Sequence, residues 1–496
     1  MARHKDEARL LYLLWSLPAL LVIGLIASGR AGILKAAVIG TGVALAIAFG
    51  AAPHRFAAAD AAVALARGAW IGWVIVPYIV GGLFFWQLAV RPGRAAVATR
   101  QPPDDPRARR RLLFAACFLV GPFAESVTGF GVGIIGTMTL LRPLGLKPVF
   151  LLAFSLFSQT MILWGAMGSG SIVGAAFAGM SPTDLALHSS LLVATINLAW
   201  LPLFWRLARQ AGLGTTGPEL LGEALWLAAC LALVVGATAL LGPEAAMLAT
   251  YGPMIVLRFL RDERPGRDAV IAAFTRTLPF TLVIAWLVAG QLVAPLHQLL
   301  QEALRIAPFT GAPIWFPLSH AGTWLLVAGL LTAIARGHSY LVASELTAAW
   351  RTGRLAILTV VVFSMMAEVL SVSGIAAGLA HGLFQSLGES AIAVTPFLAG
   401  TFGVVTNGGN AGNGLFMASQ VDLATAAGFS VAFVAALQHV SGLSMSMFSP
   451  VRMAIVCGLA GTPGKERDVY RVMLPFAGLA MAILFAYAIL IALKIL

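Results

Sequence analysis

Long apolar segments separated by short polar loops run through the whole chain. A helix needs about 20 apolar residues to cross a bilayer, and segments of that kind fall near residues 10–27, 33–50, 69–90, 148–170, 184–206, 220–241, 244–258, 277–297, 314–334, 355–380, 423–458 and 472–495. They are continuously apolar, whereas the strands of a membrane barrel alternate apolar and polar positions. The pattern predicts an all-α polytopic membrane protein with about 12 transmembrane helices.

Two glycine-rich stretches interrupt this pattern, GPFAESVTGFGVGIIG at residues 121–136 and TFGVVTNGGNAGNG at 401–414. Backbone that is not helical survives at membrane depth only where protein buries it or where it lines a wet cavity. Two interruptions in corresponding halves therefore predict a transporter's binding site. The alternative is glycines that only let helices pack closely. That alternative leaves the neighbouring Glu125, Thr128, Asn407, Asn410 and Asn413 unexplained.

Composition agrees with a membrane protein. Of the 496 residues, 59% are hydrophobic and only 10% are charged, against about 25% charged residues in soluble domains. The net charge of +12 comes mostly from Lys and Arg in short loops, so it follows the positive-inside bias and does not indicate nucleic acid. Cys117, Cys230 and Cys457 lie in apolar segments without metal or disulfide spacing, and we expect neither a metal nor a cofactor. The first apolar segment shows no cleavage site and is expected to be retained.

The basic loops also predict how the two stretches cross the membrane. If residues 112–141 enter and leave on one face, the basic residues at 142–147, 206–209 and 258–276 join the basic segment 91–111, which contains Arg94 and Arg100, in the cytoplasm. The loops near 171–183 and 242–244, which lack Lys and Arg, then lie outside. The same comparison of basic loops predicts that residues 391–420 form a hairpin that enters the membrane from the opposite face. One observation disagrees, because the basic N-terminus is then placed outside.

Two re-entrant hairpins from opposite faces predict an inverted repeat. The expected parts are a first repeat at 1–219 with hairpin 112–141 and broken helix 148–170, linking helices at 220–276, and a second repeat at 277–496 with hairpin 391–420 and broken helix 423–458. An alanine-rich helix at 53–67 is expected at the membrane interface.

Each hairpin is followed by a second polar interruption, at 159–171 and at 438–450. A helix that begins at mid-membrane exposes N–H groups that suit a carboxylate, so four interruptions could enclose one anion site. The candidate substrate-binding residues are Ser126, Thr128, Gly129, Gly131, Gln159, Ser169, Thr406, Asn407, Asn410, Asn413 and Ser449. For serines such as Ser169 and Ser171, bonding back to the preceding helical turn is the alternative.

Ionisable residues inside apolar segments are functional hypotheses by default. Glu125, Glu368 and His439 are the candidate proton-coupling residues, and Arg452 is a candidate partner for a substrate carboxylate. Each has an alternative: Glu125 could simply bond hairpin N–H groups, His439 could be a packing residue, and Arg452 could snorkel toward the cytoplasm.

At these motifs the chain resembles the lactate permease family of bacteria. The motifs are FAESVTGFG at 123–131, GAMG at 165–168, FGVVTNGGNAGNGLF at 402–416 and MFSP at 447–450. The resemblance covers residues 110–457. It implies proton symport of a small 2-hydroxy monocarboxylate, lactate or glycolate, across the bacterial inner membrane by an elevator-like ion transporter. Its implied partners are the organic acid anion, protons and the lipid bilayer, and a homodimer is a further assembly to test.

The second hairpin departs from the family pattern. It carries Asn and Gly in place of serines and an acid, and Arg452 stands where a small or polar residue is expected. These departures leave open which 2-hydroxy acid is carried. A cation/proton antiporter, or a carrier of another small organic anion, remains the alternative on the same scaffold. We expect no enzyme, since His-Glu-x-x-His is absent and the serine motifs are incomplete.

Overall fold

The computed structural model describes residues 2–91, 104–129 and 131–496, with the side chains of residues 2–9 left out. Arg94 and Arg100 of the basic segment, and Phe130 of the first hairpin, lie outside the described residues. Over those ranges the chain is helical, and its one β-bridge joins Ile306 and Trp315. Eleven of its helices are long and apolar enough to cross a membrane. A polytopic all-α membrane protein is therefore confirmed.

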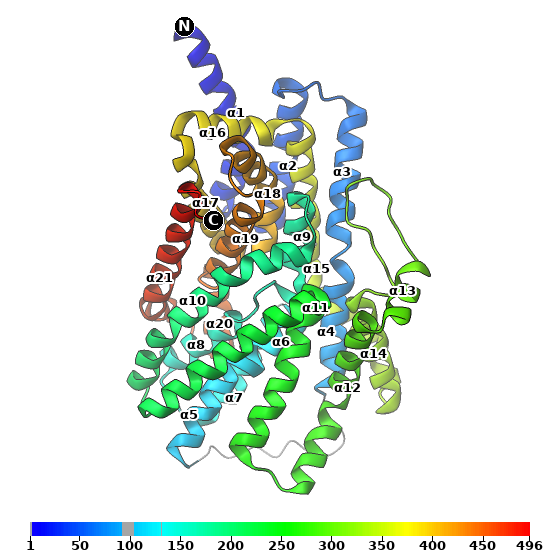
Figure 1. The fold of residues 1–496 in the computed structure, drawn as a ribbon, viewed down its shortest axis with the longest axis vertical. Coiled ribbons are helices and arrows are strands. Elements are labelled where there is room, and N and C mark those ends of the chain that lie inside the picture. Colours follow the sequence, from blue (N-terminus) through cyan, green and yellow to red (C-terminus); the bar gives the residue numbers. More distant parts are fainter. Residues whose placement is uncertain (1, 92–103, 130) are drawn as a thin grey trace.

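Figure 1 shows the order of the elements. The first half contains α1 (Ala2–Ala27), α2 (Ile33–Ala51), α3 (Ala58–Trp73), α4 (Val76–Ala89), α5 (Pro106–Ala115), η1 (Ala116–Val120), α6 (Gly121–Thr128), α7 (Val132–Leu141), η2 (Arg142–Leu144), α8 (Pro148–Leu156), η3 (Phe157–Gln159), η4 (Ala166–Gly168), α9 (Ser169–Ala178) and α10 (Pro182–Gln210). The second contains α11 (Gly217–Glu263), α12 (Arg267–Leu292), α13 (Ala294–Glu302), α14 (Ala321–Ala335), η5 (Ser339–Leu341), α15 (Val342–Val372), α16 (Ile375–Leu387), η6 (Gly388–Ala393), α17 (Val394–Thr406), α18 (Gly409–Ala427), α19 (Val431–Ser446), α20 (Pro450–Leu459) and α21 (Glu466–Ala492).

Helices α3 and α4 form one long rod that packs along α15 and α14. Glycines allow the close approach: a Cβ at Gly68 would lie 2.4 Å from the Met365 Cα, and one at Gly322 would lie 2.4 Å from the Pro77 carbonyl carbon. Residues 53–67 were expected to form a separate interfacial helix, and this prediction is wrong. From Ala58 onward they belong to the rod, because small residues on α3 fit the surface of α15.

The chain reverses direction in the first glycine-rich stretch. Helices α5 and α6 run in, α7 runs back beside them, and the Arg109 side chain donates to the Leu144 carbonyl at the open end (2.7 Å). The chain leaves helical geometry only around Gly129 and Gly131, so the predicted break over residues 121–136 is too long. Pro122 is accommodated by the π-helical turn η1, since proline clashes with the carbonyl one turn earlier.

The second hairpin is built from α17 and α18. The Thr395 hydroxyl donates to the Gln420 side chain at its open end (2.5 Å), and the chain reverses at Asn407 and Gly408. Both glycine-rich stretches are thus tips of helical hairpins.

The two expected broken helices differ from each other. Between α8 and α9 the backbone is irregular from residue 160 to 168, as predicted. Helix α19 instead continues without interruption to Ser446, and only Met447–Ser449 separate it from α20. Gln438, His439 and Ser441 therefore lie on a regular helix. Polar side chains alone do not end a helix, whereas Pro450 disfavours helical geometry at the residue before it.

Helix α11 folds back on itself at Gly242 (φ 75°, ψ 166°) to form a V (Figure 1). The two arms of this V also contact each other away from Gly242, because the Arg258 guanidinium of one arm lies over the Trp226 ring of the other, 5.2 Å from the ring centroid. The segment 258–276 was predicted to be a charged loop, but α11 reaches Glu263 and α12 begins at Arg267. Arginine is a good helix former, so helices continue beyond their apolar cores.

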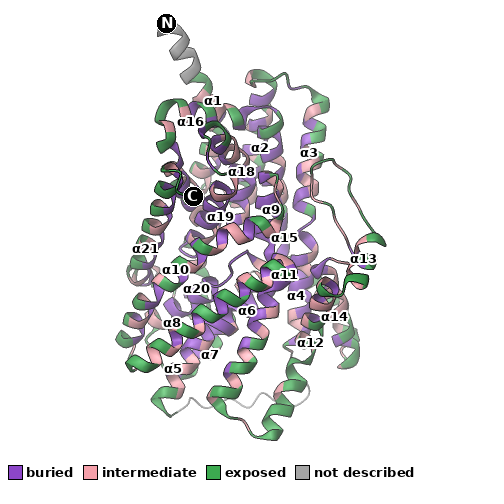
Figure 2. Cartoon of the chain, in the orientation of Figure 1, coloured by how far each residue is buried: buried purple, intermediate pink, exposed green. Residues whose placement is uncertain are grey.

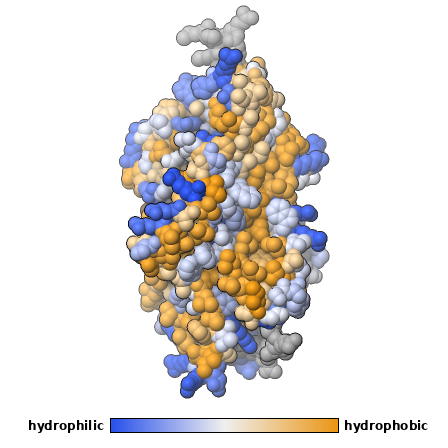
Figure 3. Space-filling model, turned by 90° about the vertical axis from the view of Figure 1, so that its right-hand side faces the viewer, coloured by the Kyte–Doolittle hydropathy of each residue, from blue (hydrophilic) through white to orange (hydrophobic). Residues whose placement is uncertain are grey.

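Burial is highest in the middle of the molecule and lowest on its outer helices (Figure 2). In α12 only 11% of the most apolar stretch is buried inside the protein, against 78% in the α3–α4 rod. Figure 3 shows apolar surface over much of one face, with hydrophilic residues at its two ends and in smaller groups along its left and right edges. An apolar outer surface is what contact with lipid requires.

Candidate functional site

The first hairpin tip is closed by its own carboxylate. Glu125 accepts hydrogen bonds from the backbone N–H of Gly131 (3.0 Å) and of Gly133 (2.8 Å). Gly129 and Gly131 have φ of 76° and 80°, which a residue with a side chain rarely adopts. Glu125 thus caps the start of α7, as its alternative reading anticipated, and its role in proton coupling stays a prediction.

The irregular segment between α8 and α9 lies against this tip. A Cβ at Gly129 would come within 2.5 Å of the Ala166 Cβ. Met167 and Gly168 both have positive φ (48° and 72°), and α9 begins at Ser169 with no side-chain cap. Its first backbone N–H groups instead bond within the irregular segment, those of Gly170 and Ser171 to the Trp164 carbonyl (3.1 and 3.3 Å).

The second tip meets the start of α9. The Asn410 side chain donates to the Ser169 hydroxyl (3.2 Å), and the Asn413 side chain donates to the Gly170 carbonyl (3.0 Å). Asn413 also lies 2.9 Å from His439 Nδ1. Helix α18, like α9, begins without a side-chain cap. Two uncapped helix N-termini from different halves of the chain are thus neighbours.

Arg452, on α20 just after the interruption 438–450, contacts two of the other interruptions. Its guanidinium donates to the Gln159 side chain (2.6 Å), to the Asn407 side chain (2.8 Å) and to the Asn407 carbonyl (3.4 Å). It does not snorkel to a protein surface. Among the described side chains, no carboxylate lies within ion-pairing distance of this guanidinium. Glu125 is the acid whose charge acts on this guanidinium from farther away. A half-buried cation whose hydrogen-bond partners are all neutral suits an anionic ligand.

Buried polar atoms without a hydrogen-bond partner gather beside the same helix starts. They are Ser171 Oγ, Asn413 Oδ1, Gln438 Oε1 and His439 Nε2. Burying an unpaired polar group costs about 1–3 kcal/mol. Several together indicate a region that accommodates a polar ligand or water.

Other predicted residues have mainly local partners. The Ser126, Thr128 and Thr406 hydroxyls bond back to their own helices, and Ser449 caps α20. These contacts match the structural alternative that the sequence left open. Glu368 pairs with Arg67 of α3 (3.4 Å), so it belongs to the α3–α15 packing. Among the described residues, no hydrogen bond joins Glu368 to the tips.

Three polar residues near the interruptions escaped the sequence-based selection. Ser171 and Gln438 have unpaired buried atoms, although both belong to stretches recognised as polar interruptions. The third, Glu244, lies just after the fold of α11 and beside the irregular segment. A Cβ at Gly168 would lie 3.1 Å from the Glu244 backbone nitrogen. In the sequence, Glu244 is a single acidic residue between two apolar segments. It was not selected because an acidic residue in a short turn is usually exposed to solvent.

A small cavity adjoins the irregular segment. Gln159 and Thr160 line it on one side, and Val193, Trp200 and Leu443 are among the residues on the other. Its walls are mostly apolar, and the Gln159 side chain also contacts Arg452. This mostly apolar space therefore lies beside Gln159, a hydrogen-bond partner of the Arg452 guanidinium.

The helical fold, its apolar surface and the convergence of interrupted helices define a multi-pass membrane protein of the transporter class. Residues 267–496 match the family described as L-lactate permease. The chain is 24% identical to the L-lactate permease of Escherichia coli K12, over 86% of each chain. It is 23% identical to that of Salmonella typhimurium over the same shares, and 24% identical to the glycolate permease GlcA of E. coli K12 over 80% of this chain and 81% of that protein. The chain is thus similar to L-lactate permeases over most of its length, which confirms the resemblance drawn from its motifs.

Proposed function

We propose that the protein imports a small 2-hydroxy monocarboxylate, lactate or glycolate, by proton symport across the bacterial inner membrane. The named relatives transport substrates of this class. The two hairpins are re-entrant, the halves 1–219 and 277–496 form an inverted repeat around the linking segment 220–276, and transport is elevator-like. These features agree with two hairpins that bring their tips to one place.

The observation that carries the proposal is the pairing of two uncapped helix N-termini, those of α9 and α18, near Arg452. Each helix N-terminus acts as roughly half a positive charge. The N–H groups of α9 bond to the Trp164 carbonyl, so a carboxylate placed there receives its backbone N–H groups from the start of α18 and can reach the guanidinium beside Asn407. The Asn410 and Asn413 side chains offer both donors and acceptors for the 2-hydroxyl group.

The apolar cavity beside Gln159 suits the methyl group by which lactate differs from glycolate. An extra methylene in an apolar pocket contributes roughly 1–3 kcal/mol. We therefore expect lactate to be preferred over glycolate by about tenfold or more in apparent affinity.

The test is uptake into proteoliposomes that contain the full chain. An inwardly directed proton gradient should drive accumulation of labelled L-lactate, and dissipating the gradient should abolish that accumulation. Unlabelled glycolate should compete, whereas a neutral analogue such as lactamide should not. Sodium-dependent proton movement without lactate uptake would instead identify a cation/proton antiporter.

A further inference from the structure

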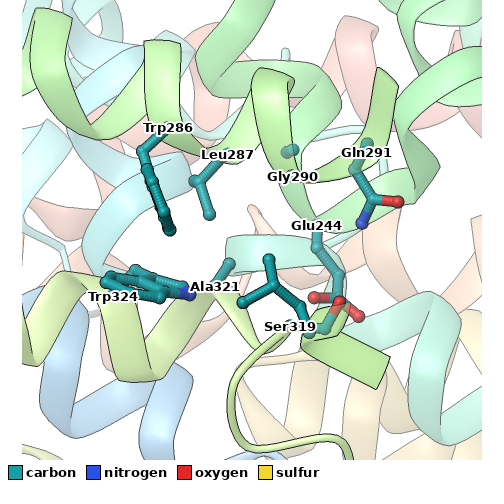
Figure 4. A pocket seen from close by; sticks show the side chains of 10 residues that line it. Glu244, Trp286, Leu287, Gly290, Gln291, Ser319, Ala321 and Trp324 are labelled. Atoms are coloured by element: carbon teal, nitrogen blue, oxygen red, sulfur yellow. The ribbon is translucent and has the colours of Figure 1, made fainter. Parts of the chain in front are cut away.

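We propose that Glu244, at the fold of α11, is the group that binds and releases the transported proton. This inference rests on the proposed proton symport, and it replaces the three acidic or basic candidates chosen from the sequence. Glu244 lies in a second pocket, formed by α11, α12 and the start of α14 (Figure 4).

The surroundings of Glu244 contain hydrogen-bond donors but no cation. The Tyr78 hydroxyl of α4 and the Ala321 backbone N–H at the start of α14 are the donors that face its carboxylate. Glu244 appears in none of the ion pairs recorded for the described residues. A carboxylate with no fixed counter-charge can become neutral without leaving a cation unpaired, which a proton carrier requires.

The competing candidates are less suited to change charge. Both oxygens of Glu125 hold the first hairpin tip through backbone N–H groups, so a proton on either oxygen would compete with one of these bonds. Glu368 faces Arg67, so its protonation would leave that guanidinium without its partner. His439 has Asn413 on one ring nitrogen and no partner on the other, inside the proposed substrate site.

The titratable groups around Glu244 can be named from each neighbouring element. Tyr78 comes from α4, and His320, directly before α14, stacks on the Tyr78 ring with centroids 3.8 Å apart. On α13, His297 lies 3.1 Å from the carbonyl of Gly290, a pocket residue. The α12 side contributes Trp286 and Gln291, and η4 contributes Gly168, none of which titrates.

Polar side chains line one end of this pocket. Figure 4 shows Glu244, Gln291 and Ser319 together, with the Trp286 and Trp324 rings on the other side. The polar end offers a proton or water a place to reach the carboxylate. The identified partners of the carboxylate are both donors, whereas a metal cation needs several oxygen ligands. The chemistry therefore favours a proton over sodium.

A structural change caused by protonation of Glu244 can be transmitted to the substrate site through a short backbone contact. Gly168, whose missing Cβ would lie 3.0 Å from the Pro243 carbonyl carbon, is followed by Ser169, the partner of Asn410. The charged carboxylate ties the fold of α11 to the N-terminus of α14, where a negative charge is stabilised. The neutral acid loses that attraction, so proton binding loosens the link between α11 and the α4–α14 pair.

The experiment compares two assays in proteoliposomes with labelled L-lactate, on the wild type and on Glu244→Gln. Accumulation driven by a proton gradient should fall about tenfold or more in the variant. Exchange of labelled for unlabelled lactate at equal pH should change by less than about threefold, because it needs no net proton movement. Glu302→Gln, on an exposed carboxylate of α13, is the matched control.

Normal accumulation by Glu244→Gln would overturn the proposal. If Glu244→Gln shows neither accumulation nor exchange, Tyr78→Phe provides the test. This variant removes one donor from the Glu244 carboxylate, so the midpoint of the pH dependence of uptake should shift upward by about half to one pH unit. An unchanged midpoint would also overturn the proposal. Absence of gradient-driven accumulation in the wild type is a separate result, since it rejects proton symport itself.

Discussion

The two hairpin tips use their polar residues in opposite ways. In the first tip, Glu125 turns inward and satisfies the N–H groups of its own hairpin. In the second tip, Asn410 and Asn413 turn outward to Ser169 and Gly170 of the other half, and the start of α18 is left without a cap.

This difference shows that two similar glycine-rich sequences can have different structural roles. The first tip completes its own hydrogen bonds, so it is a rigid wall. The second tip depends on partners far away in the chain, so its geometry changes when those partners move. We infer that recognition of the substrate belongs mainly to the second tip and Arg452, and that the first tip gives them a fixed surface.

The largest effect is expected from Arg452→Gln. Loss of the guanidinium removes a charge-assisted bond to the substrate carboxylate worth roughly 1.5–3 kcal/mol, so the apparent affinity for lactate should fall about 10- to 100-fold. Concentration-dependent exchange in proteoliposomes measures this. Arg452→Lys should recover part of the loss, since it restores charge but not the planar donor set. Unaltered affinity in both variants would remove Arg452 from the site.

A smaller and different effect is expected from Glu125→Gln. The amide offers one acceptor oxygen where the carboxylate has two, so one N–H of the tip loses its partner at a cost of about 1–2 kcal/mol. Exchange and gradient-driven accumulation should decline together, by about tenfold, with a lower unfolding temperature in detergent. Loss of accumulation with normal exchange would instead identify Glu125 as the residue that carries the proton and would contradict the assignment to Glu244.

Asn413→Ala should have a more moderate effect on the second tip. It leaves the Gly170 carbonyl and His439 Nδ1 without this donor. Because neutral hydrogen bonds contribute less than the charge-assisted bond of Arg452, apparent lactate affinity should fall about fivefold. Thr139→Ala is the control, since that exposed hydroxyl bonds only within α7. Equal behaviour of the two variants would count against a recognition role for the second tip.

The smallest functional effect is expected from labelling the open ends of the hairpins. Arg142→Cys reports on the first hairpin and Glu389→Cys on the second, and the three native cysteines are buried. Each variant should keep transport near the wild-type level and react with an impermeant maleimide from opposite faces of the membrane. Reaction from one common face would exclude hairpins that enter from opposite sides.

Much of the architecture could be predicted from the sequence because lipid leaves few options for a backbone. Continuous apolar segments must be helices, and the interruptions at both tips and before α9 were recognisable because glycine and polar residues are costly there. The extents were less predictable. Residues 121–136 looked broken throughout, yet Pro122 is absorbed by a π turn, and α19 stays helical through Gln438 and His439.

The partners of the polar residues were decided only by the tertiary structure. Asn410 and Ser169 are 241 residues apart in the chain, and Arg452 and Gln159 are 293 apart, so no local pattern could pair them. Glu244 is the clearest case. Its sequence context indicates an ordinary turn between two apolar segments, and only the packing of α4, α11 and α14 surrounds its carboxylate with donors and leaves it without a cation. Local sequence determines where a membrane helix can stop, whereas the environment of a charge is set by elements that come together from the whole chain.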